Sequence, residues 1–297
     1  MSLPEVSYVM VRLKFSIELN YDVGPQGCDF IFNMQAAHTR HQTVVTEKLD
    51  ISQALVPDMY IDPVTRNRYL RLKAFTGALK VVYGATVDIE HQLSDPSQLA
   101  EVSIGQLPLH VLPYLNPSRY CQSDRLHTFA VREFGQMWQG HSRVQAIRDW
   151  VAQHVVFTSN STNGNTSAVD TIVEQVGVCR DFAHLMIALC RAVNIPARFA
   201  TGIDYGADPA LGPTDFHAYV EAFLGDRWYL FDPSGTAIPM GFVRLATGRD
   251  AADAAFATMF GGVNAAQPII SIEAVPNAQG ELVTPFHSLK ALSTDGQ

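Results

Sequence analysis

One cysteine in the sequence stands where a nucleophilic enzyme would place its thiol. Cys179 follows Gly177 and opens a segment in which Phe182, Leu185 and Leu189 recur at helical spacing. In the first turn of a helix, unpaired backbone N–H groups and the positive end of the dipole favour the thiolate over the thiol. The sequence therefore predicts that Cys179 is a nucleophile, provided that a base lies close to it.

The structural alternative for Cys179 is a small buried hydrophobe, which is the usual role of a free cysteine. Cys190 lies eleven residues further along the same predicted helix, inside its apolar pattern, and is expected in the core. Cys28 and Cys121 have no histidine and aspartate arrangement nearby and are expected to be structural. Because no C-x-x-C pair occurs, we expect neither a zinc site nor a disulfide scaffold.

The base and its partner are expected on one β-hairpin. The segment Asp215–Leu224 alternates as a strand, and Arg227–Asp232 follows after only Gly225-Asp226. Glycine at the first central position suits a two-residue type II′ turn, which pairs the two residues that flank it and fixes the register of every later pair.

This register brings His217 and Asp232 to the same face of the hairpin. Tyr219 opposes Asp232, so His217 is the diagonal neighbour of Asp232, within reach of a hydrogen bond. Pro233 ends regular pairing there and leaves both residues at the open end of the hairpin. Asp232 would then orient the imidazole and stabilise its charged form, as the third member of a catalytic triad does.

A few other polar residues have a weaker claim on the site. His184 follows Cys179 by five positions, about 140° around the helix, and is expected in the core or in a supporting hydrogen bond. Glu221 shares the hairpin face and is expected either to line the site or to be solvated. Gln175 and Asn165 are weak candidates for a second oxyanion donor beside the N–H of Cys179. The other histidines carry no local signal of chemistry: His38, His41, His91, His110, His127, His141, His154 and His287.

Two regions with different patterns position these residues. Short runs of β-branched and aromatic residues, bounded by turn residues, fill the first third of the chain. They span Val9–Leu19, Thr43–Leu49, Arg68–Phe75 and Leu79–Ile89. We therefore predict an N-terminal antiparallel β-sandwich domain over residues 1–110.

The pattern changes to helical spacing after the proline-containing stretch Leu112–Ser118. Helices are expected at residues 142–157, 168–175 and 178–193, followed by strands. Residues 111–297 are thus predicted to form an α+β catalytic domain, in which the cysteine helix precedes the histidine and aspartate hairpin.

Composition excludes several classes of partner. The 297 residues carry a formal net charge of -8 without a lysine and arginine cluster, which argues against nucleic acid. Apolar residues make up 47% of the chain, enough for a sizeable core, but no run approaches the ~18 residues of a membrane span. The first residues lack a signal-peptide pattern, so a cytoplasmic protein is expected. No calcium loop or other metal or cofactor motif is found, and the oligomeric state is not encoded in any pattern.

Several motifs together resemble the bacterial transglutaminase-like family. They are Gly177–His184, Ile195–Arg198, Asp215–Tyr219, Asp232-Pro233 and Gly248–Asp253, in this order along the chain. The β-rich region before them resembles the N-terminal domain that often accompanies this catalytic core. The resemblance implies a papain-like α+β domain in which the cysteine helix packs on an antiparallel sheet that carries the histidine and aspartate. Tyr219 departs from the family, which often has tryptophan after His-Ala.

These observations predict a cysteine-dependent acyl-transfer enzyme acting on amide or isopeptide bonds of peptides or proteins. Cys179 would attack the carbonyl, with His217 and Asp232 as its catalytic partners and a thioester as the intermediate. A non-catalytic binding or scaffold protein that retains the fold is the main alternative. A metalloenzyme using Cys179, His184 and His217 is a third hypothesis, although these residues lack the spacing of a known metal site.

Overall fold

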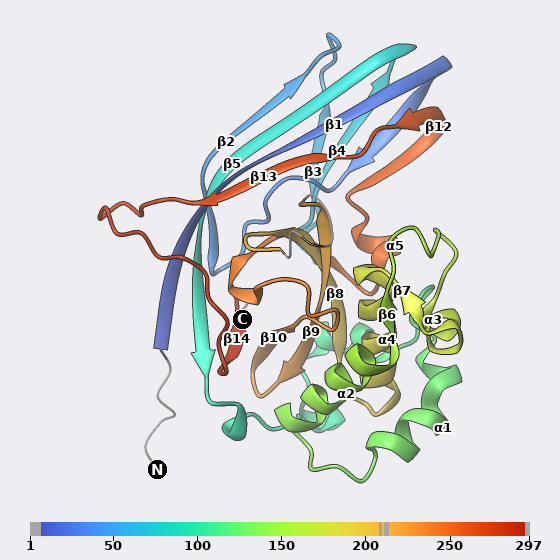
Figure 1. The fold of residues 1–297 in the computed structure, drawn as a ribbon, viewed down its shortest axis with the longest axis vertical. Coiled ribbons are helices and arrows are strands. Elements are labelled where there is room, and N and C mark those ends of the chain that lie inside the picture. The colour runs from blue at the N-terminus through green and yellow to red at the C-terminus, as the bar shows by residue number, and fades with distance from the viewer. Residues whose placement is uncertain (1–6, 208–209, 211–213, 295–297) are drawn as a thin grey trace.

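The computed structural model describes residues 7–207, 210 and 214–294 (Figure 1). Its strands are β1 (Ser7–Phe32), β2 (Gln42–Ile51), β3 (Asp58–Ile61), β4 (Arg68–Ala74), β5 (Gly77–Ser94), β6 (Val156–Phe157), β7 (Val176–Gly177), β8 (Ala197–Asp204), β9 (Phe216–Leu224), β10 (Arg227–Phe231), β11 (Phe242–Gly248), β12 (Ala257–Ala265), β13 (Ile269–Ala274) and β14 (Ala291–Ser293). Its α-helices are α1 (Ser123–Phe134), α2 (His141–His154), α3 (Ala168–Glu174), α4 (Cys179–Ala192) and α5 (Ala251–Ala254). Short 3₁₀ turns lie at Pro96–Gln98, Ile104–Gln106, Leu109–Leu115 and Pro239–Gly241.

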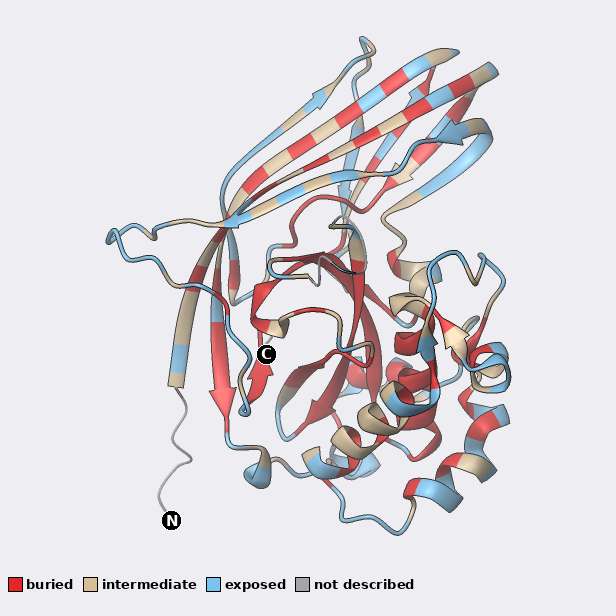
Figure 2. Cartoon of the chain, in the orientation of Figure 1, coloured by how far each residue is buried: buried red, intermediate tan, exposed pale blue. Residues whose placement is uncertain are grey.

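The long strands β1 and β5 are the centre of a large antiparallel sheet (Figure 1). They pair without interruption from Ser7 opposite Leu93 to Val23 opposite Gly77. Alternate residues of β1 are buried along most of its length, as the two-residue period of a strand requires when one face packs on a core (Figure 2). The antiparallel β-structure predicted for the N-terminal region is thus confirmed, although its strands join in one large sheet where two packed sheets of a sandwich were expected.

Strands from the C-terminal end of the chain complete this sheet. β13 and β12 pair in turn along one edge of β1, and β14 pairs with β5. The sheet is therefore not built from the first 110 residues alone. The sequence did not reveal this, because pairing between segments so distant in the chain leaves no local pattern. The division into residues 1–110 and 111–297 stays a prediction.

The second sheet has four antiparallel strands in the order β10-β9-β8-β11. α4 packs on β8 and β9, and α1, α2 and α3 pack around α4. From Asp181 to Ala192 every residue of α4 is buried, which makes it the central helix of the domain (Figure 2). The three predicted helices are confirmed, and α4 begins at Cys179 as expected.

The two sheets share one hydrophobic core. Residues of β1, β4 and β5 belong to the same buried cluster as Tyr219, Met240 and Phe242. A buried polar link also joins the two parts, because the Gln42 side chain bonds to both the N–H and the carbonyl of Arg244, at 2.9 and 2.8 Å. The large sheet therefore holds the small sheet that carries the site residues.

An ion network lies across three strands of the small sheet. Glu221 on β9 is fully buried and binds Arg198 of β8, with Oε2 2.6 Å from Nε, and also Arg244 of β11. The Arg198 guanidinium lies 4.3 Å from the centre of the Trp228 ring. Glu221 is therefore neither a site-lining nor a solvated residue, and both interpretations from the sequence are wrong. The sequence could not reveal its ion partners, because they lie on strands that only the tertiary fold brings beside it.

Burial of His91 on β5 makes the stability depend on pH. Burial lowers the pKa of His91 to about 4, and its Nδ1 lies 3.3 Å from the Val9 carbonyl. In the unfolded chain the ring titrates near pH 6.5, so the unfolded state takes up a proton first as the pH falls. This contribution to stability is complete above pH 6.5 and is lost as the pH falls toward 4.

We expect His91→Gln to lose about 2 kcal/mol less of its free energy of unfolding than the wild type between pH 7 and pH 4.5. Urea unfolding at both pH values measures this difference, and each protein is its own control. Equal losses in the two proteins would contradict a buried neutral His91.

Candidate active site

The start of α4 is fixed by the residues around Cys179. Asp181, which is completely buried, accepts hydrogen bonds at Oδ2 from the Val178 N–H at 3.0 Å and the Thr162 hydroxyl at 2.6 Å. A Cβ at Gly177 would lie 2.8 Å from that of Asp181, so the close approach requires glycine. Cys179 is the first residue of the helix and is partly exposed, which places its thiol near the unpaired first-turn N–H groups.

The predicted hairpin register is confirmed. Gly225 has a φ of 60°, as the first central residue of a type II′ turn requires. Leu224 pairs with Arg227, and the ladder continues to Val220 opposite Phe231. The register therefore brings the start of β9 and the residue after β10 to the same end of the sheet.

His217 and Asp232 meet at this end. The imidazole Nε2 lies 3.4 Å from Asp232 Oδ1, and both side chains are buried. Asp232 also accepts from the hydroxyl of Ser234 at 2.6 Å and from the N–H of Ala237 at 3.3 Å. The Nε of Arg148 donates to the Asp232 carbonyl at 2.7 Å. The carboxylate is thus held in place by several donors besides the histidine.

A second carboxylate, which the sequence did not reveal, faces the other ring nitrogen. Asp204, the last residue of β8, lies with Oδ2 3.8 Å from Nδ1 of His217. Its Oδ1 accepts a hydrogen bond of 2.7 Å from the Tyr219 hydroxyl. Gly202 pairs with His217 across the two strands, which brings Asp204 near the ring, but no turn adjacent in sequence sets that register.

The charges of these residues are coupled. Burial opposes a charge on His217, but Asp204 and Asp232 outweigh it and raise the pKa of the imidazole well above its usual value. Burial alone would raise the pKa of Asp232, yet the charge and hydrogen bonds of His217 and Ser234 lower it to about 2. Burial raises the pKa of Asp204 to about 6, against the lowering effect of His217 and Tyr219. The arrangement favours an imidazolium beside an ionised Asp232.

Cys179 shares a cavity of about 220 Å³ with His217. A hydrogen bond with Cys179 is one of the interactions that raise the pKa of His217. The Cys179 Sγ also lies 4.0 Å from the Phe216 carbonyl. Aromatic residues supply much of the cavity wall, and Phe216 and Phe256 stack there with their ring centres 3.9 Å apart. Cys179 and His217 therefore face one partly apolar opening, and Asp232 lies behind the imidazole, outside the residues that line this cavity.

The other cysteines have the structural role expected of them. Cys28, Cys121 and Cys190 are all buried. Burial raises the pKa of Cys121 to about 12 and also raises that of Cys190, which disfavours the thiolate. Of the four, only Cys179 is accessible.

His184 supports the cavity wall. Its Nε2 accepts a hydrogen bond of 3.1 Å from the Ala251 N–H, and its ring stacks on Tyr120 at 4.9 Å. Asp250 accepts from the Tyr120 N–H at 2.9 Å, and both Tyr120 and Ala251 line the cavity. The expected supporting role of His184 is thus confirmed, and its Nε2 faces the start of α5.

The two oxyanion candidates are placed elsewhere. Gln175 and Asn165 are exposed, and neither is among the described residues that line the cavity beside Cys179. Gln175 ends α3 in the left-handed conformation, with φ 57°. The sequence could not exclude them, because proximity along the chain does not set the direction of a loop side chain.

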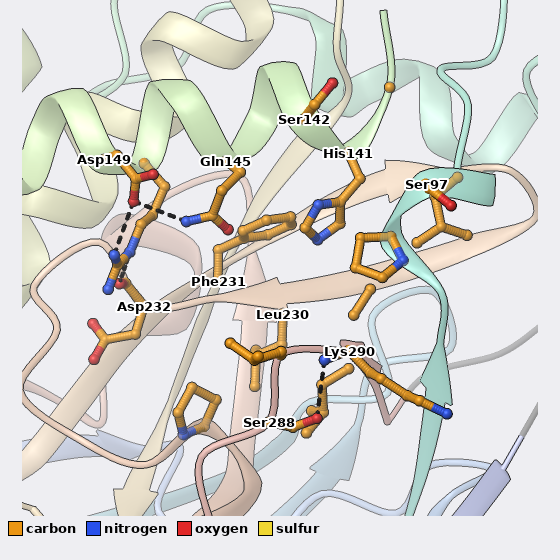
Figure 3. A pocket seen from close by; sticks show the side chains of 18 of the residues that line it. Ser97, His141, Ser142, Gln145, Asp149, Leu230, Phe231, Asp232, Ser288 and Lys290 are labelled. Atoms are coloured by element: carbon orange, nitrogen blue, oxygen red, sulfur yellow. Dashed lines mark hydrogen bonds and ion pairs between the residues drawn. The ribbon is translucent and has the colours of Figure 1, made fainter.

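A larger cavity of about 1190 Å³ is lined by Asp232 but by neither Cys179 nor His217 (Figure 3). It lies between the start of α2, the end of β10 and the segment Phe286–Leu292. His141 and Phe231 face each other in it, with ring centres 5.1 Å apart. The cavity offers both apolar and polar surface close to the site.

Within the part of the chain that the structure describes, no helix has the length and apolar character to cross a membrane. Residues 1–6, on which the expectation about a signal peptide partly rests, lie outside the described residues. Among the residues that are described, no group of three histidine, cysteine, aspartate or glutamate side chains is arranged to hold a metal ion.

Comparison with known proteins places the chain in a family. The family model of the transglutaminase-like superfamily matches residues 131–233, and that of the bacterial transglutaminase N-terminal domain matches residues 11–110. A solved structure from Cytophaga hutchinsonii, described as a "Putative Cysteine Protease", is 39% identical with a TM-score of 0.88. The similarity covers 97% of this chain and 99% of that one.

Uncharacterized mycobacterial proteins are more distant relatives. One from Mycobacterium leprae is 26% identical over 146 residues, which are 48% of this chain and 52% of that protein. One from Mycobacterium bovis is 27% identical over 142 residues, 42% of this chain and 45% of that protein. The chain thus spans about half the length of the curated relatives that it matches. On the family models and the Cytophaga structure, the chain belongs to the transglutaminase-like superfamily and carries the N-terminal domain of bacterial transglutaminases.

Proposed function

We propose that the chain is a cysteine-dependent acyl-transfer enzyme that acts on amide or isopeptide bonds of peptides or proteins. The observation that carries this proposal is the shared cavity: Cys179 at the start of α4 opens into the same space as His217. Asp232 fixes one nitrogen of that imidazole at 3.4 Å. A thiol, a base and an orienting carboxylate are the parts that nucleophilic catalysis needs.

The proposed reaction has two halves. In the first, Cys179 gives its proton to His217, the sulfur attacks the carbonyl carbon, and the amine leaves with the proton from His217, which forms a thioester. In the second, water or an amine attacks the thioester as His217 takes its proton, and the thiol is restored when that proton returns to sulfur. The N–H of Cys179 at the helix start would donate to the oxyanion. Asp232 keeps the ring oriented in both halves.

The two cavities indicate how a substrate could be held. The small cavity has aromatic walls and room for one side chain or the reacting bond. The larger cavity beside Asp232 carries exposed Trp138 and Leu289, which suit contacts with a longer chain. We therefore propose a peptide or protein substrate. The cytoplasmic location inferred from the sequence stays part of the same proposal.

Trapping the acyl-enzyme tests this function. The protein is incubated with peptide and isopeptide libraries, quenched in acid and digested, and mass spectrometry locates acyl adducts. We expect adducts on the peptide that contains Cys179, discharged by water or by an added primary amine. The faster of the two distinguishes hydrolysis from transfer. Adducts found only on other residues, or none with any library, would count against the proposal.

A binding or scaffold protein remains the second candidate, and the exposed residues around the larger cavity favour it. Cys179→Ala separates the two functions. A scaffold should bind its partner as well in this variant as in the wild type, whereas an enzyme should still bind substrate but lose turnover.

A further inference from the structure

The imidazole of His217 has a carboxylate at each ring nitrogen. Asp232 lies 3.4 Å from Nε2, and Asp204 lies 3.8 Å from Nδ1. Because Nε2 is directed to Asp232, Nδ1 is the nitrogen left to exchange a proton with Cys179. Asp204 therefore faces the ring edge that the thiol must use, a position that a three-residue catalytic group leaves without a carboxylate.

Tyr219 fixes Asp204 in this position. Its hydroxyl donates to Asp204 at 2.7 Å, and its ring meets His217 edge to face at 4.7 Å. Tyr219 is completely buried, and burial next to the carboxylates raises its pKa well above the usual value, so it stays a donor. Asp204 is held by a neutral donor on one oxygen and faces the imidazole with the other.

The groups around Asp204 determine when it ionises. Asp204 interacts with His217 and Tyr219 of β9 and with the charge of Asp232, which follows the end of β10. On β11, the residue that pairs with Asp204 is the apolar Phe242. Burial raises the pKa of Asp204 to about 6, which His217 and Tyr219 limit and Asp232 reinforces. Asp232, by contrast, is ionised throughout the range from pH 4 to pH 9, because its pKa is about 2.

We propose that Asp204 is a positioning residue for the base: when ionised, it stabilises the imidazolium of His217 and so promotes the thiolate of Cys179. Protonation of Asp204 neutralises the carboxylate that lies beside Nδ1 and so weakens the ion pair between imidazolium and thiolate. Only the O–H bond of the carboxyl forms or breaks in this switch, with water as the proton source. The inference rests on the proposed function and adds an acid-side regulation to the same site.

The test is the rate of iodoacetamide labelling of Cys179 between pH 4 and pH 9, with the labelled residue identified by mass spectrometry. The wild type is expected to show a rise in rate with a midpoint near the Asp204 pKa. Asp204→Asn keeps an acceptor for Tyr219 but cannot ionise, so it should match the wild type at low pH, lose this rise, and label about tenfold more slowly at pH 7.5. Tyr219→Phe removes a donor that favours the ionised carboxylate, so the rise should persist but move to higher pH.

The outcomes separate the two claims. A rise near pH 6 that persists unchanged in Asp204→Asn, or an unmoved midpoint in Tyr219→Phe, overturns the role of Asp204 while the proposed function stands. A wild-type Cys179 that labels no faster at pH 6 to 7 than an unfolded cysteine peptide overturns the proposed function itself. If Asp204→Asn does not fold, as judged by circular dichroism, the Tyr219→Phe midpoint decides the inference.

Discussion

Replacing Cys179 with alanine is expected to lower the rate of amide turnover by at least about 10³-fold and to remove the acyl adduct altogether. The reason is that the other cysteines are buried and their thiols are held protonated where burial raises the pKa. Turnover of a substrate found by trapping measures the loss. Cys121→Ala is the matched control, because it removes a buried thiol without touching the cavity, and it should keep both activity and labelling.

His217→Ala should be nearly as damaging and should also change the chemistry of the thiol. Without the imidazolium, Cys179 has lost its main counter-charge, so labelling by iodoacetamide should require a higher pH than in the wild type. The start of α4 is retained, because its hydrogen bonds come from Asp181 and Thr162. A variant that labels at neutral pH as fast as the wild type would mean that the helix start alone activates the sulfur.

Glu221→Ala is expected to lower the free energy of unfolding by about 3–5 kcal/mol, the largest effect on stability that the structure predicts. The substitution leaves two arginines, Arg198 and Arg244, in a buried site without the carboxylate that they share. Glu221→Gln should be less damaging, because its amide oxygen still accepts one hydrogen bond. Urea unfolding at pH 7 measures both variants.

The control for this prediction is an exposed ion pair. Asp58 and Arg71 are bound on adjacent strands of the large sheet, with both side chains largely exposed, at 71% and 67%. Asp58→Asn should therefore cost no more than about 1 kcal/mol. If Glu221→Ala were as mild as this control, the network would not be a buried structural link between β8, β9 and β11.

The placement of the network also connects stability to the site. Glu221 lies four residues after His217 on β9, and Tyr219 lies between them on the same face. The arginines fix β8 and β11 against β9, and β8 ends at Asp204. The pH profile of Cys179 labelling in a folded Glu221→Gln protein should thus show whether the positions of the carboxylates around His217 depend on the network.

The sequence by itself determined the features that short spans of chain enforce. The start of α4 follows from Gly177 and from the helical spacing of Phe182 and Leu185, because both signals lie within a few turns of the chain. The pairing of β9 with β10 follows from a two-residue turn at Gly225, which leaves no freedom in the register. For that reason the residue pattern alone is enough to place His217 and Asp232 on one face of the hairpin.

Only the tertiary structure decided what lies beside these residues from distant parts of the chain. Asp204 reaches His217 because β8 pairs with β9 across a long connection, and Glu221 meets Arg244 from a strand that follows it by about twenty residues. The pairing of β12 and β13 with β1 joins the two ends of the chain. Such contacts depend on how whole sheets pack, since a long connection does not fix a register. The second carboxylate at the imidazole is therefore a property of the fold.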